Sequence, residues 1–245
     1  MNLKSFGCSF IFGSELPDAG FGTVSATVSK LTWPAQLAQQ LNQEYLCYAR
    51  PGAGNLQIAE RALCHLATNE PSLYVIGWTW IDRFDYFDVN DLYEKKPTSG
   101  TPEDEIWWND TRAQYRHKWN TVMPVDETDM AKFYYKNLHS EIRDKLTTLM
   151  SIKLVIDTLK QKGYPFIMTY MDDLMFDTRW HTTLAITDIQ NYIRPYMTQF
   201  DNMNFLDWSK KNNFDIAPGG HPLQQAHAVA SKLIYNTYTS TNDAK

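Results

Sequence analysis

Two residues near opposite ends of the chain, Ser9 and His221, have the side chains that acyl transfer requires. Ser9 ends a Gly-Cys-Ser turn that follows a short apolar stretch, and His221 stands directly before a proline. Acyl transfer needs a serine nucleophile, a histidine that accepts its proton, and N–H donors that hold the oxyanion. The sequence therefore predicts Ser9 as the nucleophile and His221 as the general base.

Candidate oxyanion donors follow the second and third apolar stretches of the chain. Gly54 and Asn55 come after the second stretch, and Thr79 comes after the third. In an open α/β sheet, ligands bind outside the carboxyl ends of the strands, so these turns should meet the turn of Ser9 at one edge. We expect amides of these turns to supply oxyanion donors.

Trp78, Trp80 and Arg83 follow the third apolar stretch directly, which should bring them to the border of the Ser9 pocket. Indole faces suit sugar rings, and a guanidinium suits a carboxylate or a phosphate. We therefore expect these three side chains to bind substrate. The alternative is that the tryptophans pack a small core of their own segment.

Short apolar stretches alternate with helical patterns along most of the chain. The strands and helices that these patterns predict must position the candidate site residues. Such alternation with short connections favours a parallel sheet covered by helices. The sequence predicts a three-layer α/β/α fold of the flavodoxin-like type with a parallel five-stranded sheet. The expected strands lie at residues 3–10, 45–49, 73–76, 166–170 and 204–206, and the expected helices begin near residues 34 and 55 and span residues 130–162, 184–199 and 223–238.

An aromatic-rich segment interrupts this rhythm at about residues 78–129. It contains Trp107, Trp108 and Trp119 and a polar turn with proline and glycine. We interpret it as an insertion over the sheet after the third strand. Residues 1–245 are accordingly expected to form a single α/β domain, which suits a chain of this length.

The charge balance and the cysteines argue against several classes of protein. The chain has 23 Lys and Arg against 28 Asp and Glu, a net charge of -5, whereas nucleic-acid binding calls for a basic surface. Three dispersed cysteines argue against a disulfide framework and a zinc ribbon. Neither a signal peptide nor a membrane-spanning stretch is recognised. We expect a cytoplasmic protein, or one later carried in a virus particle, with no metal and no cofactor.

The order of these segments resembles the sequence blocks of the SGNH (GDSL-like) hydrolases. Residues 7–9 are similar to the first block, which carries the nucleophile, with Cys8 in place of the usual aspartate. Gly54 is similar to the second-block glycine, and Thr79 stands where the third block has asparagine. The resemblance implies that the amides of Ser9 and Gly54, together with Thr79 or Asn55, hold the oxyanion. His221 resembles the last block, which supplies the base. The resemblance implies an SGNH-type fold over nearly the whole chain apart from the aromatic segment, and the short motifs are also similar to SGNH-like proteins of tailed phages.

The group that orients the histidine departs from the pattern of this family. SGNH hydrolases usually have an aspartate shortly before the histidine, but Pro218 and Gly219 occupy those positions. Asp215 is the nearest carboxylate, and Asp207 is the next. The sequence leaves open whether Asp215 completes a triad or a backbone carbonyl orients His221 in a Ser-His dyad.

We therefore expect a serine ester hydrolase, an esterase or deacetylase that acts on a small-molecule ester or an acetylated carbohydrate. The alternative is a catalytically weak or inactive SGNH-fold module with a binding or structural role, for example in a phage virion. Its partners would then be phage structural proteins or further copies of the same chain. Hydrogen-bond reach between Ser9 Oγ and His221 Nε2 would favour the enzyme.

Overall fold

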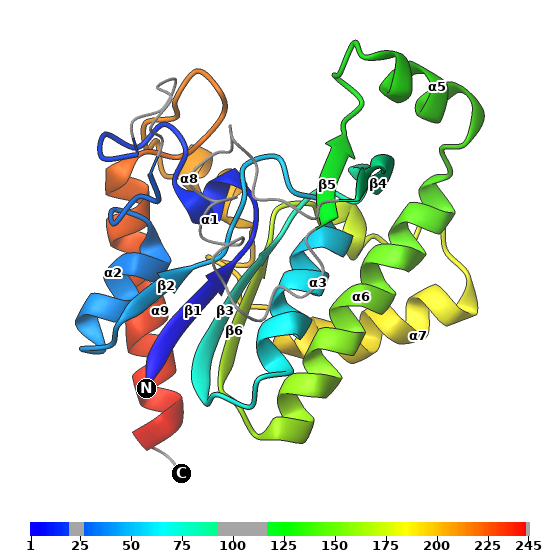
Figure 1. Cartoon of the computed structure of the whole chain (residues 1–245). Helices are drawn as coiled ribbons and strands as arrows, with labels where there is room; N and C mark the ends of the chain where they lie inside the picture. Colours follow the sequence, from blue (N-terminus) through cyan, green and yellow to red (C-terminus); the bar gives the residue numbers. More distant parts are fainter. Residues whose placement is uncertain (20–26, 93–116, 244–245) are drawn as a thin grey trace.

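A parallel sheet forms the centre of the computed structural model, which describes residues 1–19, 27–92 and 117–243 (Figure 1). The strands run in the order β2-β1-β3-β6, and each neighbouring pair is parallel. The central strand β3 is buried along its whole length, as expected where helices cover both faces of a sheet. The four strands are β1 (Asn2–Phe6), β2 (Tyr45–Cys47), β3 (Ser72–Trp78) and β6 (Phe166–Tyr170).

Over the described residues, the main sheet has four strands and not the predicted five. The prediction of a strand at residues 204–206 is wrong because Asn204 caps a helix there, its side chain accepting a hydrogen bond from the Asp207 N–H at 2.9 Å. The place of a fifth strand beside β6 is taken by a single parallel bridge between Met168 and Met197. One backbone hydrogen bond, from Thr198 N–H to the Met168 carbonyl at 2.7 Å, accompanies this bridge.

Helices cover both faces of the sheet, so the predicted three-layer α/β/α arrangement is confirmed (Figure 1). Helix α2 packs against α9 on one face, while α3 and α7 pack against α6 on the other. Among the described residues, no helix is sufficiently long and apolar to cross a membrane. The helices are α1 (Ser9–Phe12), α2 (Trp33–Gln40), α3 (Asn55–Leu66), α5 (Asp129–Asn137), α6 (Glu141–Lys162), α7 (Leu184–Ile193), α8 (Phe205–Lys211) and α9 (Gln224–Asp243), with short 3-10 turns η1 (Asp173–Met175) and η2 (Arg194–Tyr196).

The single long helix predicted at residues 130–162 is two helices, α5 and α6. A new cap at Ser140 accounts for the break, while Thr128 caps the first of the two helices. Thr128 accepts a hydrogen bond from Ala131 N–H at the start of α5, and Ser140 accepts one from Arg143 N–H at the start of α6. Gly163 ends α6 in the left-handed conformation, as its position in the sequence predicts.

A two-stranded antiparallel ribbon follows β3 and lies within the segment predicted as an insertion. It consists of β4 (Phe84–Leu92) and β5 (His117–Val122). The buried residues Val122, Ala131 and Tyr134 form a small cluster between this ribbon and α5. Of the aromatic residues named above, Trp119 is buried in β5, whereas Trp107 and Trp108 lie outside the described residues.

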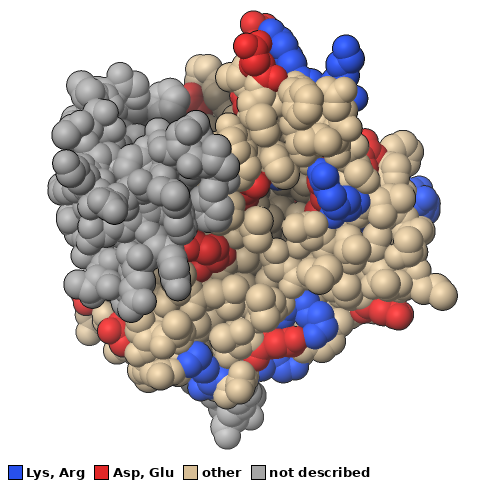
Figure 2. Space-filling view, turned by 45° about the vertical axis from the view of Figure 1, so that its right-hand side comes forward, with Lys and Arg blue, Asp and Glu red and all other residues tan. Residues whose placement is uncertain are grey.

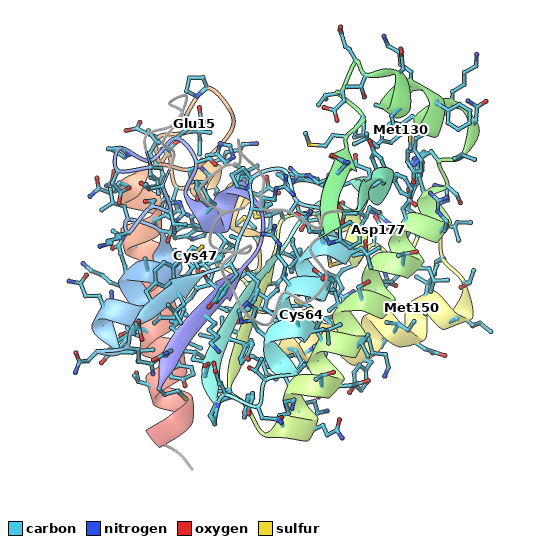
Figure 3. All side chains as sticks on the ribbon, in the orientation of Figure 1. Glu15, Cys47, Cys64, Met130, Met150 and Asp177 are labelled. Atoms are coloured by element: carbon cyan, nitrogen blue, oxygen red, sulfur yellow. The ribbon has the colours of Figure 1, made fainter. Side chains whose placement is uncertain are left out.

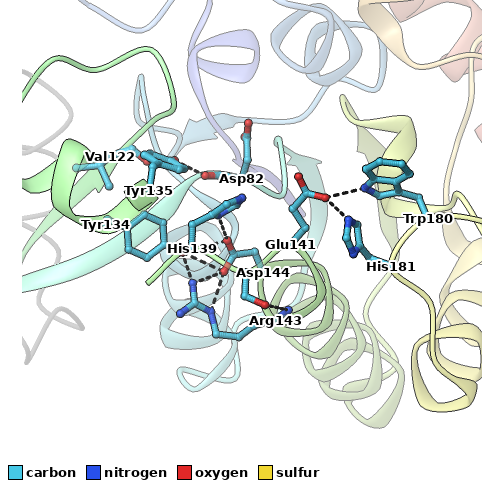
Figure 4. Close-up of polar contacts among 11 residues, drawn as sticks. Asp82, Val122, Tyr134, Tyr135, His139, Glu141, Arg143, Asp144, Trp180 and His181 are labelled. Atoms are coloured by element: carbon cyan, nitrogen blue, oxygen red, sulfur yellow. Dashed lines mark hydrogen bonds and ion pairs between the residues drawn. The ribbon is translucent and has the colours of Figure 1, made fainter. Parts of the chain in front are cut away.

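A polar cluster ties the first turn of α6 to its neighbours (Figure 4). The Asp144 carboxylate accepts a hydrogen bond from the Tyr134 hydroxyl of α5 at 3.0 Å and lies 2.9 Å from His139 Nδ1. On the other side of the turn, Glu141 accepts a hydrogen bond from the Trp180 indole N–H at 2.7 Å. These contacts fix α5 and the loop before α7 to α6, so we assign the cluster a structural role.

Candidate active site

Ser9 lies at the carboxyl end of β1, where the chain turns into the short helix α1. Cys8 has extended backbone angles and precedes the helix, so Ser9 is its first residue. The helix ends at Gly13, which has a φ of 87° and donates its N–H to the Ser9 carbonyl at 2.8 Å. A Cβ on Gly13 would lie 2.5 Å from Ser29 Cβ, so both the backbone angles and the packing require glycine there.

The predicted nucleophile and base are hydrogen-bonded to each other. His221 Nε2 lies 2.8 Å from Ser9 Oγ, although 212 positions separate the two residues in the sequence. The loop that carries His221 runs between Ala217 and Pro222 and is closed by a hydrogen bond from Ala217 N–H to the His221 carbonyl at 2.8 Å. Ser9 is 8% exposed, so its hydroxyl lies in a nearly dry setting.

Glu15 orients the imidazole from its other side, at the carboxyl edge of the sheet (Figure 3). Its Oε2 lies 2.5 Å from His221 Nδ1, and its Oε1 accepts a hydrogen bond from Gly219 N–H at 3.0 Å. Burial raises the pKa of Glu15, but the hydrogen bonds from His221 and Gly219 outweigh it and leave the pKa below the usual value. An ionised carboxylate can only accept, so Nδ1 carries the proton and Nε2 is free to accept from Ser9.

The carboxylate beside His221 is therefore Glu15, and the expectation of Asp215 or a backbone carbonyl is wrong. Asp215 is exposed, and its backbone carbonyl accepts from Leu223 N–H at 2.9 Å. Sequence reasoning missed Glu15 because 206 positions separate it from His221. The one local signal is Gly13, which stops α1 and lets the chain turn back so that Glu15 faces the site.

Two of the four expected oxyanion donors, Gly54 and Asn55, are engaged in internal hydrogen bonds, as is the backbone N–H of Thr79. Gly54 N–H donates to Asp85 Oδ1 at 3.0 Å. The Asn55 side-chain amide donates to the Thr79 carbonyl at 3.0 Å, and its oxygen accepts from Thr79 N–H at 2.8 Å. The Thr79 hydroxyl is buried and has no hydrogen-bond partner among the described residues. Gly54 N–H and the Asn55 amide are thus occupied, which leaves the Ser9 N–H and the Thr79 hydroxyl as the remaining candidates among the four.

Trp80 is linked to the Ser9–His221 pair through Phe10, whereas Arg83 contacts Trp80 and lines a different cavity, and Trp78 is buried in the core. The Trp80 ring packs edge-on against Phe10 with centroids 5.7 Å apart, and Phe10 lies 4.9 Å from the His221 ring. The Arg83 guanidinium lies 4.9 Å from the centre of the Trp80 ring. Trp78 has no exposed surface and packs in the core between the sheet and α3, so the expectation that it binds substrate is wrong.

A separate cavity of about 180 Å³ lies between the start of α3, the start of β4 and the first turns of α6. The face on which α6 comes forward is hollowed, with basic and acidic side chains nearby (Figure 2). Arg83 and Asp85 line the cavity, but Ser9 and His221 do not. Across the described residues, no group of three or more His, Cys, Asp or Glu side chains is arranged to hold a metal ion.

Comparisons with known proteins find similarity at the level of structure. No protein-family model matches the chain, and no curated protein matches it. A member of the lipolytic G-D-S-L family from Veillonella parvula is 9% identical, with a TM-score of 0.47 over 98% of each chain. The psychrotrophic esterase EstA from Pseudoalteromonas sp. is also 9% identical, with a TM-score of 0.49 over 99% of this chain and 98% of that one.

A third similar structure belongs to a longer protein. An acetyl xylan esterase from the rumen bacterium Butyrivibrio proteoclasticus is 12% identical, with a TM-score of 0.49 over 99% of this chain and 64% of its own.

Proposed function

We propose that this protein is a serine ester hydrolase of the SGNH type that uses Ser9, His221 and Glu15 as a triad. The observation that carries the proposal is the continuous hydrogen-bonded chain from Glu15 through His221 to Ser9, with contacts of 2.5 Å and 2.8 Å. A nucleophile, a base and a group that orients the base are the parts that define this chemistry, whatever the fold that holds them.

The reaction follows from the positions of the three side chains. Ser9 Oγ attacks the ester carbonyl while its proton passes to His221 Nε2, and Glu15 stabilises the resulting imidazolium. His221 then returns the proton to the departing alcohol, which leaves an acyl group on Ser9. A water molecule attacks this ester with His221 again as the base, and release of the carboxylic acid restores the Ser9 hydroxyl.

The surroundings of the pair favour a small acyl group joined to a ring-bearing alcohol. Ser9, the first residue of α1, is 8% exposed and hydrogen-bonded to the His221 ring, and a compact acyl group such as acetyl suits a nucleophile in such a setting. Trp80 is partly exposed beside Phe10, and an indole face of this kind suits a sugar ring. We therefore place acetylated carbohydrates first among the candidate substrates.

Hydrolysis of a short-chain chromogenic acetate tests this function. The wild type is expected to turn over, and Ser9→Ala and His221→Ala are expected to lose that activity. Ser151→Ala is a matched control, since Ser151 lies on α6 and donates its hydroxyl to the Thr147 carbonyl at 2.8 Å. A fluorophosphonate probe should label the wild type and the control but not Ser9→Ala. Equal background in all four proteins, with no labelling of Ser9, would contradict the proposal.

A binding module without turnover is the second candidate. The engagement of Gly54 N–H by Asp85 favours it, because this amide is then not directed at an oxyanion. Loss of one oxyanion donor costs about 3 kcal/mol of transition-state stabilisation, which lowers turnover without removing the triad. Binding of an acetylated sugar that is equal in wild type and Ser9→Ala, with no hydrolysis by either, would support this candidate.

A further inference from the structure

The carboxylate of Asp85 joins the β4–β5 ribbon to the start of α3. Its Oδ1 accepts from Gly54 N–H at 3.0 Å and from the Thr121 hydroxyl at 2.6 Å, and its Oδ2 accepts from Gln57 N–H at 3.0 Å. Gly54 precedes α3 and has no side chain to cap it, yet the first N–H groups of a helix lack intrahelical acceptors. Asp85 therefore supplies, from a neighbouring strand, the cap that α3 lacks.

The close approach of Asp85 explains why residue 54 is a glycine. A Cβ on Gly54 would lie 2.4 Å from Asp85 Oδ2, a separation that real atoms do not adopt. Asp85 is 7% exposed, and burial raises its pKa while the three hydrogen bonds to Thr121, Gln57 and Gly54 act in the opposite direction. Gly54 thus has a structural role that is independent of any oxyanion.

Asn55, the next residue, links the start of α3 to the loop after β3 through hydrogen bonds of its side chain. Its side-chain oxygen accepts from Thr79 N–H at 2.8 Å, and its N–H₂ donates to the carbonyls of Thr79 at 3.0 Å and Trp80 at 3.3 Å. The Trp80 ring in turn contacts Phe10, which packs against the His221 ring. A continuous set of contacts therefore leads from Asp85 to the catalytic pair.

We propose that Asp85 is a positioning residue for the Ser9 site. By fixing the first turn of α3, it allows Asn55 to hold the loop that places Trp80 beside Phe10. Asp85 acts through Asn55 and takes no part in the reaction itself. This inference rests on the proposed hydrolase function, and it assigns to the β4–β5 ribbon a part in building the site.

The substitution Asp85→Asn tests this role, because it keeps the size of the side chain but turns an N–H₂ group toward one of the N–H donors. We expect amide hydrogen exchange to become faster at Thr79 as well as at Gly54 and Gln57. The kcat for the chromogenic acetate should fall by about 10-fold to 100-fold, the range that a small misplacement of a site produces. A larger effect on kcat than on KM separates misplacement of the reacting groups from loss of substrate contacts.

Asp126→Asn is the matched control for this experiment. Asp126 also accepts from a backbone N–H, that of Met123 at 2.8 Å, but in the turn after β5 and away from α3. Exchange at Thr79 and kcat should be unchanged in this variant. Thr121→Val is a milder test if Asp85→Asn does not fold, since it removes one donor to Asp85 and keeps both backbone bonds. It should shift Thr79 exchange and kcat in the same direction by a smaller amount.

Two results separate this proposal from the proposed function. Faster exchange at Gly54 and Gln57, with Thr79 exchange and kcat as in the wild type, would make Asp85 a helix cap only and overturn the proposal. If Asp85→Asn does not fold and Thr121→Val does, Thr79 exchange and kcat in Thr121→Val that match the wild type would also overturn the proposal. If the wild type shows no turnover that depends on Ser9, the hydrolase function fails, and exchange at Thr79 still decides whether Asp85 holds the loop.

Discussion

Replacement of Glu15 by glutamine should change which ring nitrogen of His221 carries the proton, while the shape of the site stays the same. Glutamine has nearly the same size, and its oxygen can still accept from Gly219 N–H, which now lies 3.0 Å from Glu15 Oε1. Its N–H₂ group would face His221 Nδ1, where the carboxylate oxygen now lies at 2.5 Å. A donor at that place favours the tautomer with the proton on Nε2, and such an imidazole cannot accept the proton of Ser9.

The expected loss in kcat is large because the wrong tautomer disables the base. The corresponding change in serine proteases costs about 10⁴-fold, or roughly 5 kcal/mol in activation free energy. The Glu15 and His221 side chains are 10% and 14% exposed, so water is poorly placed to substitute for the carboxylate. We expect Glu15→Gln to lose about 10³-fold to 10⁴-fold in kcat, with KM changed little.

The assay is hydrolysis of the chromogenic acetate by wild type, Glu15→Gln, Glu15→Asp and Asp215→Asn. Glu15→Asp should recover part of the activity, because a shorter carboxylate still accepts from Nδ1. Asp215 is exposed, so Asp215→Asn should match the wild type. Activity of Glu15→Gln within threefold of the wild type, in a protein whose Ser9→Ala variant is inactive, would refute the triad. Loss of activity in Asp215→Asn but not in Glu15→Gln would refute it equally.

Three further results are expected. Trp80→Ala should raise KM for an acetylated sugar by about 3-fold to 10-fold through lost ring contact, and an unchanged KM would remove Trp80 from the binding site. His227 is fully buried, accepts from Trp33 N–H at 3.1 Å and has its pKa lowered by burial to about 3. Between that value and about 6.5 the unfolded chain binds a proton on His227 and the folded one does not, so the contribution of His227 to the free energy of unfolding should fall by about 2 kcal/mol from pH 7 to pH 5. A His227→Gln variant whose urea midpoint depends on pH as that of the wild type does would contradict this. Gly54→Ala should destabilise the wild type by about 1–3 kcal/mol but cost less in an Asp85→Ala background, and additive losses in a thermal double-mutant cycle would show that the two residues do not interact.

The parts of the site that local patterns encode could be predicted from the sequence. Ser9 follows a short apolar stretch, and His221 lies in a Gly-rich loop before the last helix, and parallel strands bring such turns to one edge. The spacing of apolar residues likewise predicted α2, α3, α9 and the four strands of the sheet. These elements depend on periodicity and on caps within a few residues, which a single sequence displays.

The missed parts depend on contacts between residues far apart in the chain. Glu15 adopts a φ of 67°, which its residue type does not predict, and its partner His221 is 206 positions away in the sequence. Gly54 was assigned to the oxyanion because a family pattern has glycine there, whereas the close approach of Asp85 supplies a different reason. Asn204 was missed for a different, local reason, since an asparagine before an apolar run can precede a helix as readily as a strand.

The order in which the chain is synthesised has a consequence for the Ser9 site. The nucleophile and its carboxylate lie within the first turn of chain after β1, but the imidazole between them is 206 positions from Glu15 and 212 from Ser9. α9, which follows the His221 loop, packs on α2. A nascent chain on the ribosome therefore carries Ser9 and Glu15 without the imidazole that lies between them, and the hydrogen-bonded set of three side chains can form only after the His221 loop and α9 have emerged and docked.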